Sequence, residues 1–173
     1  TLGLPLIVKP AREGSTIGLS KVHHKQDLAE AYRLAAQHDA LVLAEEFIAG
    51  TELTVAILGE TSLPVVRIEI AGELYDYQAK YFSNETKYFC PSGLPDELES
   101  IIQNQALRAY QVLGCQGWGR VDLILSQTNQ FYFLEANTSP GMTNHSLVPM
   151  AARTAGISFE DLVLRILDLS HVE

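Results

Sequence analysis

The sequence predicts an α+β fold in which antiparallel hairpins dominate and helices pack against the sheets. Two pairs of strand-like segments are each joined by a short turn, namely residues 51–58 with 63–70 and residues 119–125 with 130–136. A helical pattern of apolar residues separates the two pairs at residues 96–113. Strands joined in this way pair antiparallel, whereas parallel strands need a longer crossover.

The composition is that of a folded chain, with 173 residues, 47% apolar residues, 19% charged residues and a net charge of −9. The longest apolar runs are about five residues, far short of a membrane span. An acidic chain also binds nucleic acid and anionic membranes poorly. We therefore expect neither a nucleic-acid nor a membrane partner.

The two cysteines and the first residues indicate the cellular compartment of the chain and its relation to a longer polypeptide. Cys90 and Cys115 form no CxxC pair and no metal pattern with the five histidines, which favours free thiols in a reducing, cytoplasmic compartment. There is no signal-peptide pattern. Because the chain does not begin with Met and opens within three residues of a strand-like run, we expect it to be a piece of a longer polypeptide.

The elements ahead of the first hairpin follow from short apolar runs punctuated by glycine and proline. The helix among them has apolar residues at helical spacing. In chain order they are a buried strand at 4–9 ended by Pro10, a glycine-bearing loop at 12–18, a strand at 19–22, a helix at 27–37, a buried strand at 41–44 and a connector at 45–50.

The remaining segments follow the same signals. Residues 75–92 show no period and are predicted as a long loop. Helices are expected at 147–155 and 158–169, the second with a capping box formed by Ser158 and Asp161. The helix at 96–113 ends at Gly114, and its apolar stripe is predicted to contain Leu98, Ile101, Ile102, Ala109, Val112 and Leu113.

The second hairpin brings charged residues together. Residues two apart on a strand share a face, so Arg120 lies with Asp122, and Glu135 with Asn137. A two-residue turn at 128–129 would set Asp122 directly opposite Glu135. Both faces also carry apolar residues, so the charged face is not expected to be a plain solvent face. These are Val121, Leu123 and Leu125 on one face, and Ile124, Phe131 and Phe133 on the other.

The paired carboxylates create an electrostatic problem. At about 5 Å they repel by roughly 3 kcal/mol at an effective dielectric of 20, whereas a good cross-strand pair contributes only about 0.2–1 kcal/mol. Arg120 supplies one compensating charge. Magnesium is the natural second, because Asp122, Glu135 and Asn137 offer hard oxygen ligands. The alternatives are an exposed hairpin whose carboxylates face water, or one carboxyl that stays protonated.

Four other segments are suited to a nucleotide or a carboxylate. Lys9 with the loop at 12–18 can hold a phosphate, although the loop is neither a Walker A nor a Rossmann motif and could be an ordinary turn. The stretch 45–48 can offer backbone groups to a purine and Glu52 can bind ribose hydroxyls, or this is a solvated linker. Lys80 and Tyr81 lie in the long loop. Residues 137–146 offer amides and hydroxyls for an oxyanion.

In this order the motifs resemble the D-alanine–D-alanine ligases of the ATP-grasp superfamily, over essentially the whole chain. The Glu-x-Asn strand leading into a Thr-Ser-Pro-Gly-Met loop is the most specific signal. The motifs are residues 8–10 (Val-Lys-Pro), 12–15 (Arg-Glu-Gly-Ser), 77–81 (Tyr-Gln-Ala-Lys-Tyr), 117–122 (Gly-Trp-Gly-Arg-Val-Asp) and 134–143 (Leu-Glu-Ala-Asn-Thr-Ser-Pro-Gly-Met-Thr).

The resemblance implies a reaction and a role for each motif. ATP phosphorylates one D-alanine, the amine of a second attacks the acyl phosphate, and the dipeptide serves peptidoglycan synthesis. Asp122, Glu135 and Asn137 would bind two Mg²⁺ (or Mn²⁺) ions, with Arg120 and the Gly141 amide stabilising the tetrahedral intermediate. The implied ATP residues are Lys9, Glu45, Phe47, Ile48, Glu52 and Lys80; Ser146 and Leu147 would hold the second D-alanine, and Ser15 with Tyr81 would lock a mobile loop.

The chain also departs from the family pattern. It has no counterpart of the amino-terminal domain, so residues 1–47 would be part of a central ATP-binding lobe and residues 48–173 the carboxy-terminal lobe. We expect this chain alone to be inactive, and the full-length protein to be a homodimer. The alternatives are another ATP-grasp ligase, such as a D-alanine–D-lactate ligase that lacks the equivalent of Tyr81, a non-catalytic nucleotide-binding module, or a structural fragment.

Overall fold

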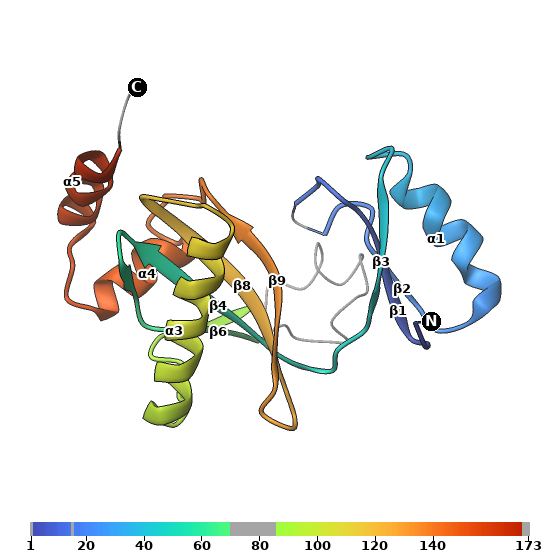
Figure 1. Cartoon of the computed structure of the whole chain (residues 1–173), viewed down its shortest axis with the longest axis horizontal. Coiled ribbons are helices and arrows are strands. Elements are labelled where there is room, and N and C mark those ends of the chain that lie inside the picture. Colours follow the sequence, from blue (N-terminus) through green and yellow to red (C-terminus); the bar gives the residue numbers. More distant parts are fainter. Residues whose placement is uncertain (1, 15, 70–85, 171–173) are drawn as a thin grey trace. The chain divides into compact units, whose positions relative to one another are not determined.

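The computed structural model describes residues 2–14, 16–69 and 86–170, and it divides them into two compact units (Figure 1). Residues 2–48 belong to one unit, and residues 49–69 with 87–170 form the other. Each unit has its own hydrophobic core. Within these described ranges, no helix combines the length and the hydropathy needed to cross a lipid bilayer.

The first unit is a three-stranded antiparallel sheet with one helix against it. Strands β1 (Leu6–Pro10), β2 (Ser20–Val22) and β3 (Val42–Glu46) lie in the order β2-β1-β3. The chain between β2 and β3 forms a 3₁₀ turn, η1 (Lys25–Asp27), and helix α1 (Leu28–Ala35). Alternation along the strands turns one set of side chains onto α1, where the core is made of Leu6, Val8, Val22, Ala31 and Ala35.

The strand predicted at residues 41–44 is present but is not buried. It spans Val42–Glu46, so Glu45 and Glu46 belong to it rather than to a connector. Leu43 is 37% exposed, and only Val42 from this strand packs on the α1 core. The prediction of burial was wrong because β3 is an edge strand in the described sheet, where one neighbour and one helix cannot cover both faces.

The second unit is a larger antiparallel sheet. The strands run β7-β6-β4-β8-β9, with β5 also paired to β4. Their bounds are β4 (Gly50–Leu58), β5 (Thr61–Ser62), β6 (Val66–Glu69), β7 (Lys87–Phe89), β8 (Trp118–Ser126) and β9 (Phe131–Asn137).

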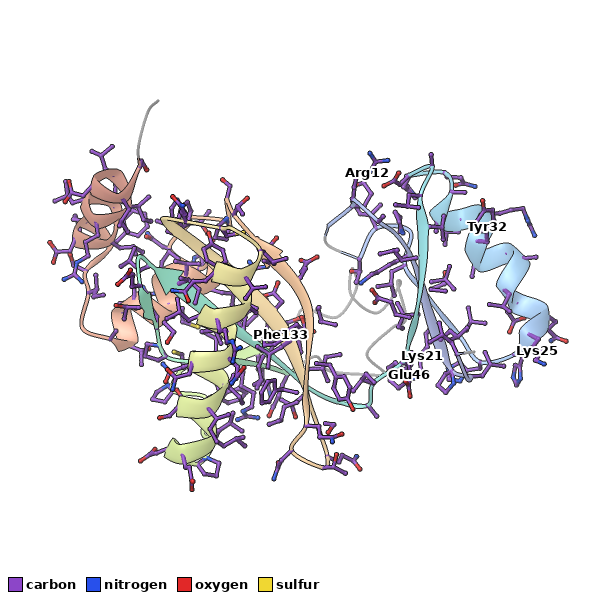
Figure 2. All side chains as sticks on the ribbon, viewed as in Figure 1. Arg12, Lys21, Lys25, Tyr32, Glu46 and Phe133 are labelled. Carbon is purple, nitrogen blue, oxygen red and sulfur yellow. The ribbon has the colours of Figure 1, made fainter. Side chains whose placement is uncertain are left out.

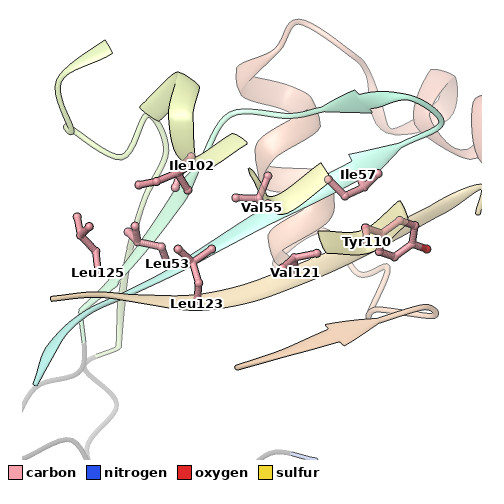
Figure 3. Close-up of a cluster of buried hydrophobic side chains, with 10 residues drawn as sticks. Leu53, Val55, Ile57, Ile102, Tyr110, Val121, Leu123 and Leu125 are labelled. Carbon is pink, nitrogen blue, oxygen red and sulfur yellow. The ribbon is translucent and has the colours of Figure 1, made fainter. Parts of the chain in front are cut away.

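Helices cover the two faces of this sheet unequally. Helix α3 (Asp96–Val112) packs along one face, and Figure 3 shows Ile102 and Tyr110 of this helix over the inward side chains of β4 and β8. Helices α4 (Leu147–Thr154) and α5 (Phe159–Leu169) pack against the Leu58 end of the other face. Towards Glu52, that second face carries polar side chains, and this is where the candidate site lies.

Several boundaries differ from the predicted ones for local reasons. The strand expected at 63–70 is β6, which starts at Val66, because Pro64 lacks the N–H that a ladder needs. Residues 87–89, expected in a loop, form β7. In α3 the buried stripe is Ile102, Ala106 and Tyr110, spaced by four, whereas Val112 is 78% exposed and Ile101 and Leu113 are also exposed.

Other predictions hold in the structure. Ser158 caps α5, because its hydroxyl accepts a hydrogen bond from the backbone N–H of Asp161 at 3.1 Å. The first predicted hairpin is present, since β4 pairs antiparallel with β6, and Gly59 and Glu60 form the turn that leads from β4 into β5. Cys90 and Cys115 are both free thiols, and burial raises the pKa of Cys90.

Candidate active site

The β8–β9 hairpin places four of the predicted site residues on one face of the second sheet. Asp122 pairs directly with Glu135, and Arg120 pairs with Asn137. The register predicted for these residues is therefore confirmed. Cross-strand neighbours of this kind have Cβ atoms about 5 Å apart, so the charges interact strongly.

The turn of this hairpin is not the two-residue turn that the sequence predicted. Ser126 N–H donates to the Gln130 carbonyl at 2.7 Å, which leaves three residues, 127–129, in the turn. Asn129 takes the left-handed conformation, with φ of 59°, that such turns require at their last position. The prediction failed because three-residue and two-residue turns have similar residue preferences.

The longer turn changes which face the aromatic residues occupy. Phe131 pairs with Leu125 and Phe133 with Leu123, so both phenylalanines lie on the α3 face and not, as predicted, with Ile124. Their rings meet edge to face with centroids 5.8 Å apart. Packing of Phe131 against the α3 core explains why this alignment is preferred near the turn.

A bulge then restores the alignment at the site. The register shifts between Asp122 and Leu123, where Leu134 is an extra residue on β9. Without that residue's bulge, the three-residue turn would place Asp122 opposite Leu134, and Glu135 would point to the α3 face. The turn and the bulge together put phenylalanines on the apolar face and carboxylates on the polar one.

Asp122 is the centre of the hydrogen-bond network. The residue is 9% exposed, and the Arg120 guanidinium binds both carboxylate oxygens, Nε to Oδ1 at 2.8 Å and Nη2 to Oδ2 at 2.7 Å. Thr54 Oγ1 donates to Oδ1 at 2.5 Å, and Asn137 Nδ2 donates to Oδ2 at 3.0 Å. Each oxygen thus accepts two hydrogen bonds, one of them in each case from Arg120.

The second carboxylate is more exposed and is linked to the first by an amide. Asn137 Nδ2 also donates to Glu135 Oε1, at 3.1 Å, so one amide group bridges the two acids. Burial alone would lower the pKa of Arg120, but the hydrogen bond and charge of Asp122, followed by the charges of Glu135 and Glu52, raise it above its ordinary value. Arg120 is therefore a permanent cation in this cluster.

The donor set fits a hard divalent cation. Asp122 and Glu135 offer carboxylate oxygens, and Asn137 offers its amide oxygen, because its Nδ2 faces the two acids. In the part of the chain that the structure describes, no three His, Cys, Asp or Glu residues gather as a metal site. That Asn137 completes a cation site with Asp122 and Glu135 stays a prediction.

The loop after β9 leads into the amino-terminal end of α4. Ser146 Oγ accepts a hydrogen bond from the Thr143 N–H at 2.9 Å, and the Arg153 guanidinium donates to the Asn144 carbonyl at 3.1 Å. Gly141 is exposed, and Leu147 is the first residue of α4. The first amides of a helix have no internal partners, so this end suits a carboxylate.

In the first unit, Lys9 and Glu45, two of the predicted nucleotide residues, lie on the sheet face opposite α1. Lys9 Nζ lies 2.7 Å from Glu45 Oε2, and β3 continues directly into Phe47 and Ile48. Lys21 (labelled in Figure 2), which sequence reasoning missed, lies on this face. Its Nζ is 3.8 Å from the centroid of the Phe47 ring. The alternation of Ser20, Lys21 and buried Val22 was the signal available for it.

The glycine-bearing loop of the first unit is tied to the turn between α1 and β3. Arg12 (labelled in Figure 2) binds Asp39 through two hydrogen bonds, Nε to Oδ2 at 2.9 Å and Nη2 to Oδ1 at 2.6 Å. The Arg12 hydrogen bond and the Leu41 N–H hold the pKa of Asp39 well below its ordinary range. Gly18, at φ of 69°, packs against His38 at the other end of the loop.

Some predicted site residues cannot be located, and one cavity lies elsewhere. Ser15, Lys80 and Tyr81 are outside the described residues. Glu52 lies on β4, on the same face as Thr54. A cavity of about 300 Å³ opens between the β4–β5 turn and α5, lined by residues that include Leu63, Arg165 and Asp168. It lies at the Leu58 end of β4, away from the carboxylates, and does not belong to the candidate site.

Known proteins match this chain along almost its whole length. A family model described as D-ala D-ala ligase C-terminus matches residues 1–168. The D-alanine–D-alanine ligase of Nitrosospira multiformis is 68% identical over 171 residues, covering 99% of this chain and 56% of that protein. The D-alanine–D-alanine ligase B of Chromobacterium violaceum is 55% identical over 171 residues, again 99% of this chain and 56% of the relative. The chain thus spans little more than half the length of these relatives.

Solved structures give the same answer for the fold. The VanG D-Ala:D-Ser ligase from Enterococcus faecalis matches with a TM-score of 0.90 and 37% identity, covering 98% of this chain and 50% of that one. The D-alanine–D-alanine ligase from Bacillus anthracis matches with a TM-score of 0.85 and 35% identity, covering 96% and 54%. These matches confirm the α+β class, the antiparallel sheets and the resemblance seen in the sequence. The chain belongs to the D-ala D-ala ligase C-terminus family.

Proposed function

We propose that the protein containing this chain is an ATP-dependent ligase that joins two D-alanines for peptidoglycan synthesis. The γ-phosphoryl group of ATP passes to the carboxylate of one D-alanine. The amine of the second attacks the acyl phosphate, and phosphate leaves as the peptide bond forms. The observation that supports this best is the cluster of Asp122, Glu135, Asn137 and Arg120 in a chain of this family.

The carboxylate cluster would hold the cations that accompany ATP. Asp122, Glu135 and Asn137 are the ligands for two Mg²⁺ or Mn²⁺ ions, which neutralise phosphate charge and favour phosphoryl transfer when bound. Arg120 adds a positive charge beside them, and with the Gly141 amide it stabilises the oxyanion of the tetrahedral intermediate. The Arg120 guanidinium suits this role, because an arginine stays charged at every working pH.

Substrate contacts are assigned to both units. Lys9 and Lys80 neutralise the phosphates, while Glu52 binds the ribose. Ser146 and Leu147, at the start of α4, bind the carboxylate of the second D-alanine. Ser15 and Tyr81 close a loop over the site. The residues assigned to the adenine are Glu45, which lies on β3, and Phe47 and Ile48, which follow this strand directly.

The identity of the second substrate is the point where relatives differ. The similar structure from Enterococcus faecalis is that of a D-Ala:D-Ser ligase, so D-serine is the competing acceptor that a specific match favours. D-lactate is a further alternative, for which replacement of Tyr81 and a search for ester product is the test. Offering D-alanine, D-serine and D-lactate to the full-length protein in competition measures the preference.

The quaternary and domain organisation is proposed on the same basis. Residues 1–47 are part of a central ATP-binding lobe and residues 48–173 the carboxy-terminal lobe of a cytoplasmic, homodimeric enzyme. The unit boundary after Ile48 supports this division. This chain alone is expected to be inactive. Dipeptide formation by the isolated chain with ATP, magnesium and D-alanine would contradict that expectation.

The experiment that tests the function uses the full-length protein. ADP release and D-alanyl-D-alanine formation are measured with Mg²⁺, and again after Asp122→Asn and Glu135→Gln. Each variant is expected to lose at least about 100-fold in activity, because a ligand to the cation is removed. Glu60→Gln, on the exposed β4–β5 turn, is the matched control. A non-catalytic nucleotide module would bind MgATP equally well in all variants, and a structural fragment would not bind it.

A further inference from the structure

Thr54 is the one buried hydroxyl in contact with the proposed metal ligands among the described residues. It lies in the middle of β4, is 1% exposed, and pairs in register with Asp122 on β8. Its Oγ1 is 2.5 Å from Asp122 Oδ1 and 3.4 Å from the Val121 carbonyl. A hydroxyl carries a single hydrogen, and the shorter distance to a charged acceptor assigns that hydrogen to the carboxylate.

This hydrogen bond completes a fixed setting for the carboxylate. Thr54 holds Oδ1 from β4, Asn137 holds Oδ2 from β9, and Arg120 spans both oxygens from β8 itself. The terminal torsion of an aspartate is broad and poorly restrained on its own. Without Thr54, Oδ1 keeps the hydrogen bond from Arg120, but no other hydrogen bond in the described residues holds it from the β4 side.

We propose that Thr54 is a positioning residue that orients Asp122 for cation binding. The inference rests on the proposed function, because Asp122 is one of the proposed metal ligands. It assigns a role to a residue on a different strand, β4. Groups that hydrogen-bond to metal ligands fix the orientation of those ligands, and their loss weakens metal binding about 10- to 100-fold. Thr54 is therefore expected to act on cation affinity more than on the rate of the chemical step.

The test uses the full-length protein with two substitutions at position 54. Thr54→Val keeps the shape and deletes the donor, and Thr54→Ser keeps the hydroxyl and loses a methyl group. Thr61→Val, at an exposed position on β5 of the same sheet, is the control. The readouts are the Mg²⁺ concentration for half-maximal activity at saturating ATP, kcat at saturating Mg²⁺, and Mn²⁺ binding in the presence of ATP followed by paramagnetic resonance. Thermal unfolding reports whether each variant is folded.

Thr54→Val is expected to raise the half-maximal Mg²⁺ concentration and the Mn²⁺ Kd by about tenfold or more, with kcat at saturation changed by less than about threefold. Thr54→Ser and Thr61→Val are expected to stay within about twofold of the unmodified protein for the same reason. An unchanged metal dependence in folded Thr54→Val, or a serine variant as impaired as valine, would overturn the proposal. If Thr54→Val does not fold, Thr54→Cys, with its weak S–H donor, is predicted to shift metal binding in the same direction.

Asp122→Asn separates this inference from the proposed function. If Asp122→Asn loses Mn²⁺ binding while Thr54→Val retains it, the role of Thr54 is refuted and the metal site stands. If neither variant affects Mn²⁺ binding in the presence of ATP, the metal site itself is wrong, and the role of Thr54 is wrong with it.

Discussion

The two faces of β4 and β8 are built from alternate residues of the same strands, yet they are held by different forces. On the α3 face, Leu53, Val55 and Leu123 have no exposed surface and pack against the helix (Figure 3). On the other face, Thr54 and Asp122 are almost as buried but are held by hydrogen bonds and by the Arg120 charge. Close packing on one face therefore fixes the backbone from which the polar groups on the other face project.

This comparison predicts separable consequences for mutations on the two faces. Loss of an apolar side chain on the α3 face should lower the free energy of unfolding and leave the cation affinity of the folded protein unchanged. Loss of a hydrogen bond on the polar face should weaken cation binding and leave the free energy of unfolding almost unchanged. A mutation that changed both quantities equally on either face would show that the faces do not act independently.

The largest effect on stability is expected for Leu123→Ala, in the middle of the α3 face. Removing a fully buried leucine leaves a cavity and costs about 2–5 kcal/mol of the free energy of unfolding. Urea denaturation of the full-length protein measures it. Val163→Ala, at a 42% exposed position on α5, is the control and should stay within about 0.5 kcal/mol. If Leu123→Ala were as stable as this control, Leu123 would not be part of a hydrophobic core on the α3 face.

The next largest effect is expected for Gly119→Ala, because Gly119 on β8 lies against both Tyr110 of α3 and Asn137 of β9. A Cβ at this position would lie 2.6 Å from the Tyr110 ring and 2.7 Å from the Asn137 carbonyl oxygen. We expect a loss of about 1–3 kcal/mol from overpacking. The Mg²⁺ requirement should rise as well, because the end of β9 that carries Asn137 must move.

Gly3→Ala serves as the control for this substitution, since nothing lies within 4 Å of the added Cβ. Tyr110 has little freedom to yield, because its hydroxyl donates to the Trp118 carbonyl at 2.6 Å. A Gly119→Ala variant with lower stability but an unchanged Mg²⁺ requirement would show that Asn137 is not positioned by this contact.

Sequence reasoning found the centre of the site because charge and alternation are local properties. Spacing alone assigned Arg120 to the face of Asp122, and Glu135 to the face of Asn137. The pairing of these two sets was right, although the two-residue turn from which it was predicted was not. The position of Phe131 and Phe133 was wrong, because it depends on whether those rings fit the α3 core. Two departures from a regular hairpin, a longer turn and a bulge, compensate each other, and neither leaves a clear sequence signal.

Thr54 and Lys21 were missed for a different reason. A threonine in an apolar strand is an ordinary residue until its cross-strand partner is known to be Asp122. Lys21 stands out only once its contact with the Phe47 ring is known, and Phe47 is distant in sequence. Of the stripe predicted for α3, Ile102 is buried, whereas Ala106 and Tyr110, which the prediction left out, are the other residues of this helix that fit against β4 and β8.

The ion pair between Arg12 and Asp39 in the first unit gives a pH prediction. The Arg12 pair lowers the pKa of Asp39, so the carboxylate stabilises the fold above the ordinary carboxyl range, about pH 4, and this contribution is lost as pH falls through the lowered pKa. Asp39→Asn should therefore lower stability at pH 7 and narrow its difference from the unmodified protein at pH 2–3. Thermal unfolding across this range measures it, with Glu30→Gln on α1 as the control. A difference that is constant with pH would contradict the role of the ionised pair.

The smallest effect is expected at the turn that sets the alignment of the β8–β9 hairpin. Asn129 has a φ of 59°, so Asn129→Gly should change the free energy of unfolding by less than about 0.5 kcal/mol, whereas Asn129→Val should cost about 1–2 kcal/mol. The Mg²⁺ requirement should stay unchanged in both, because the bulge at Leu134 lies between the turn and Asp122. Equal stability of the glycine and valine variants would mean that residue 129 is not left-handed. In that case a two-residue turn, with the phenylalanines on the polar face, would again be the better description of this hairpin.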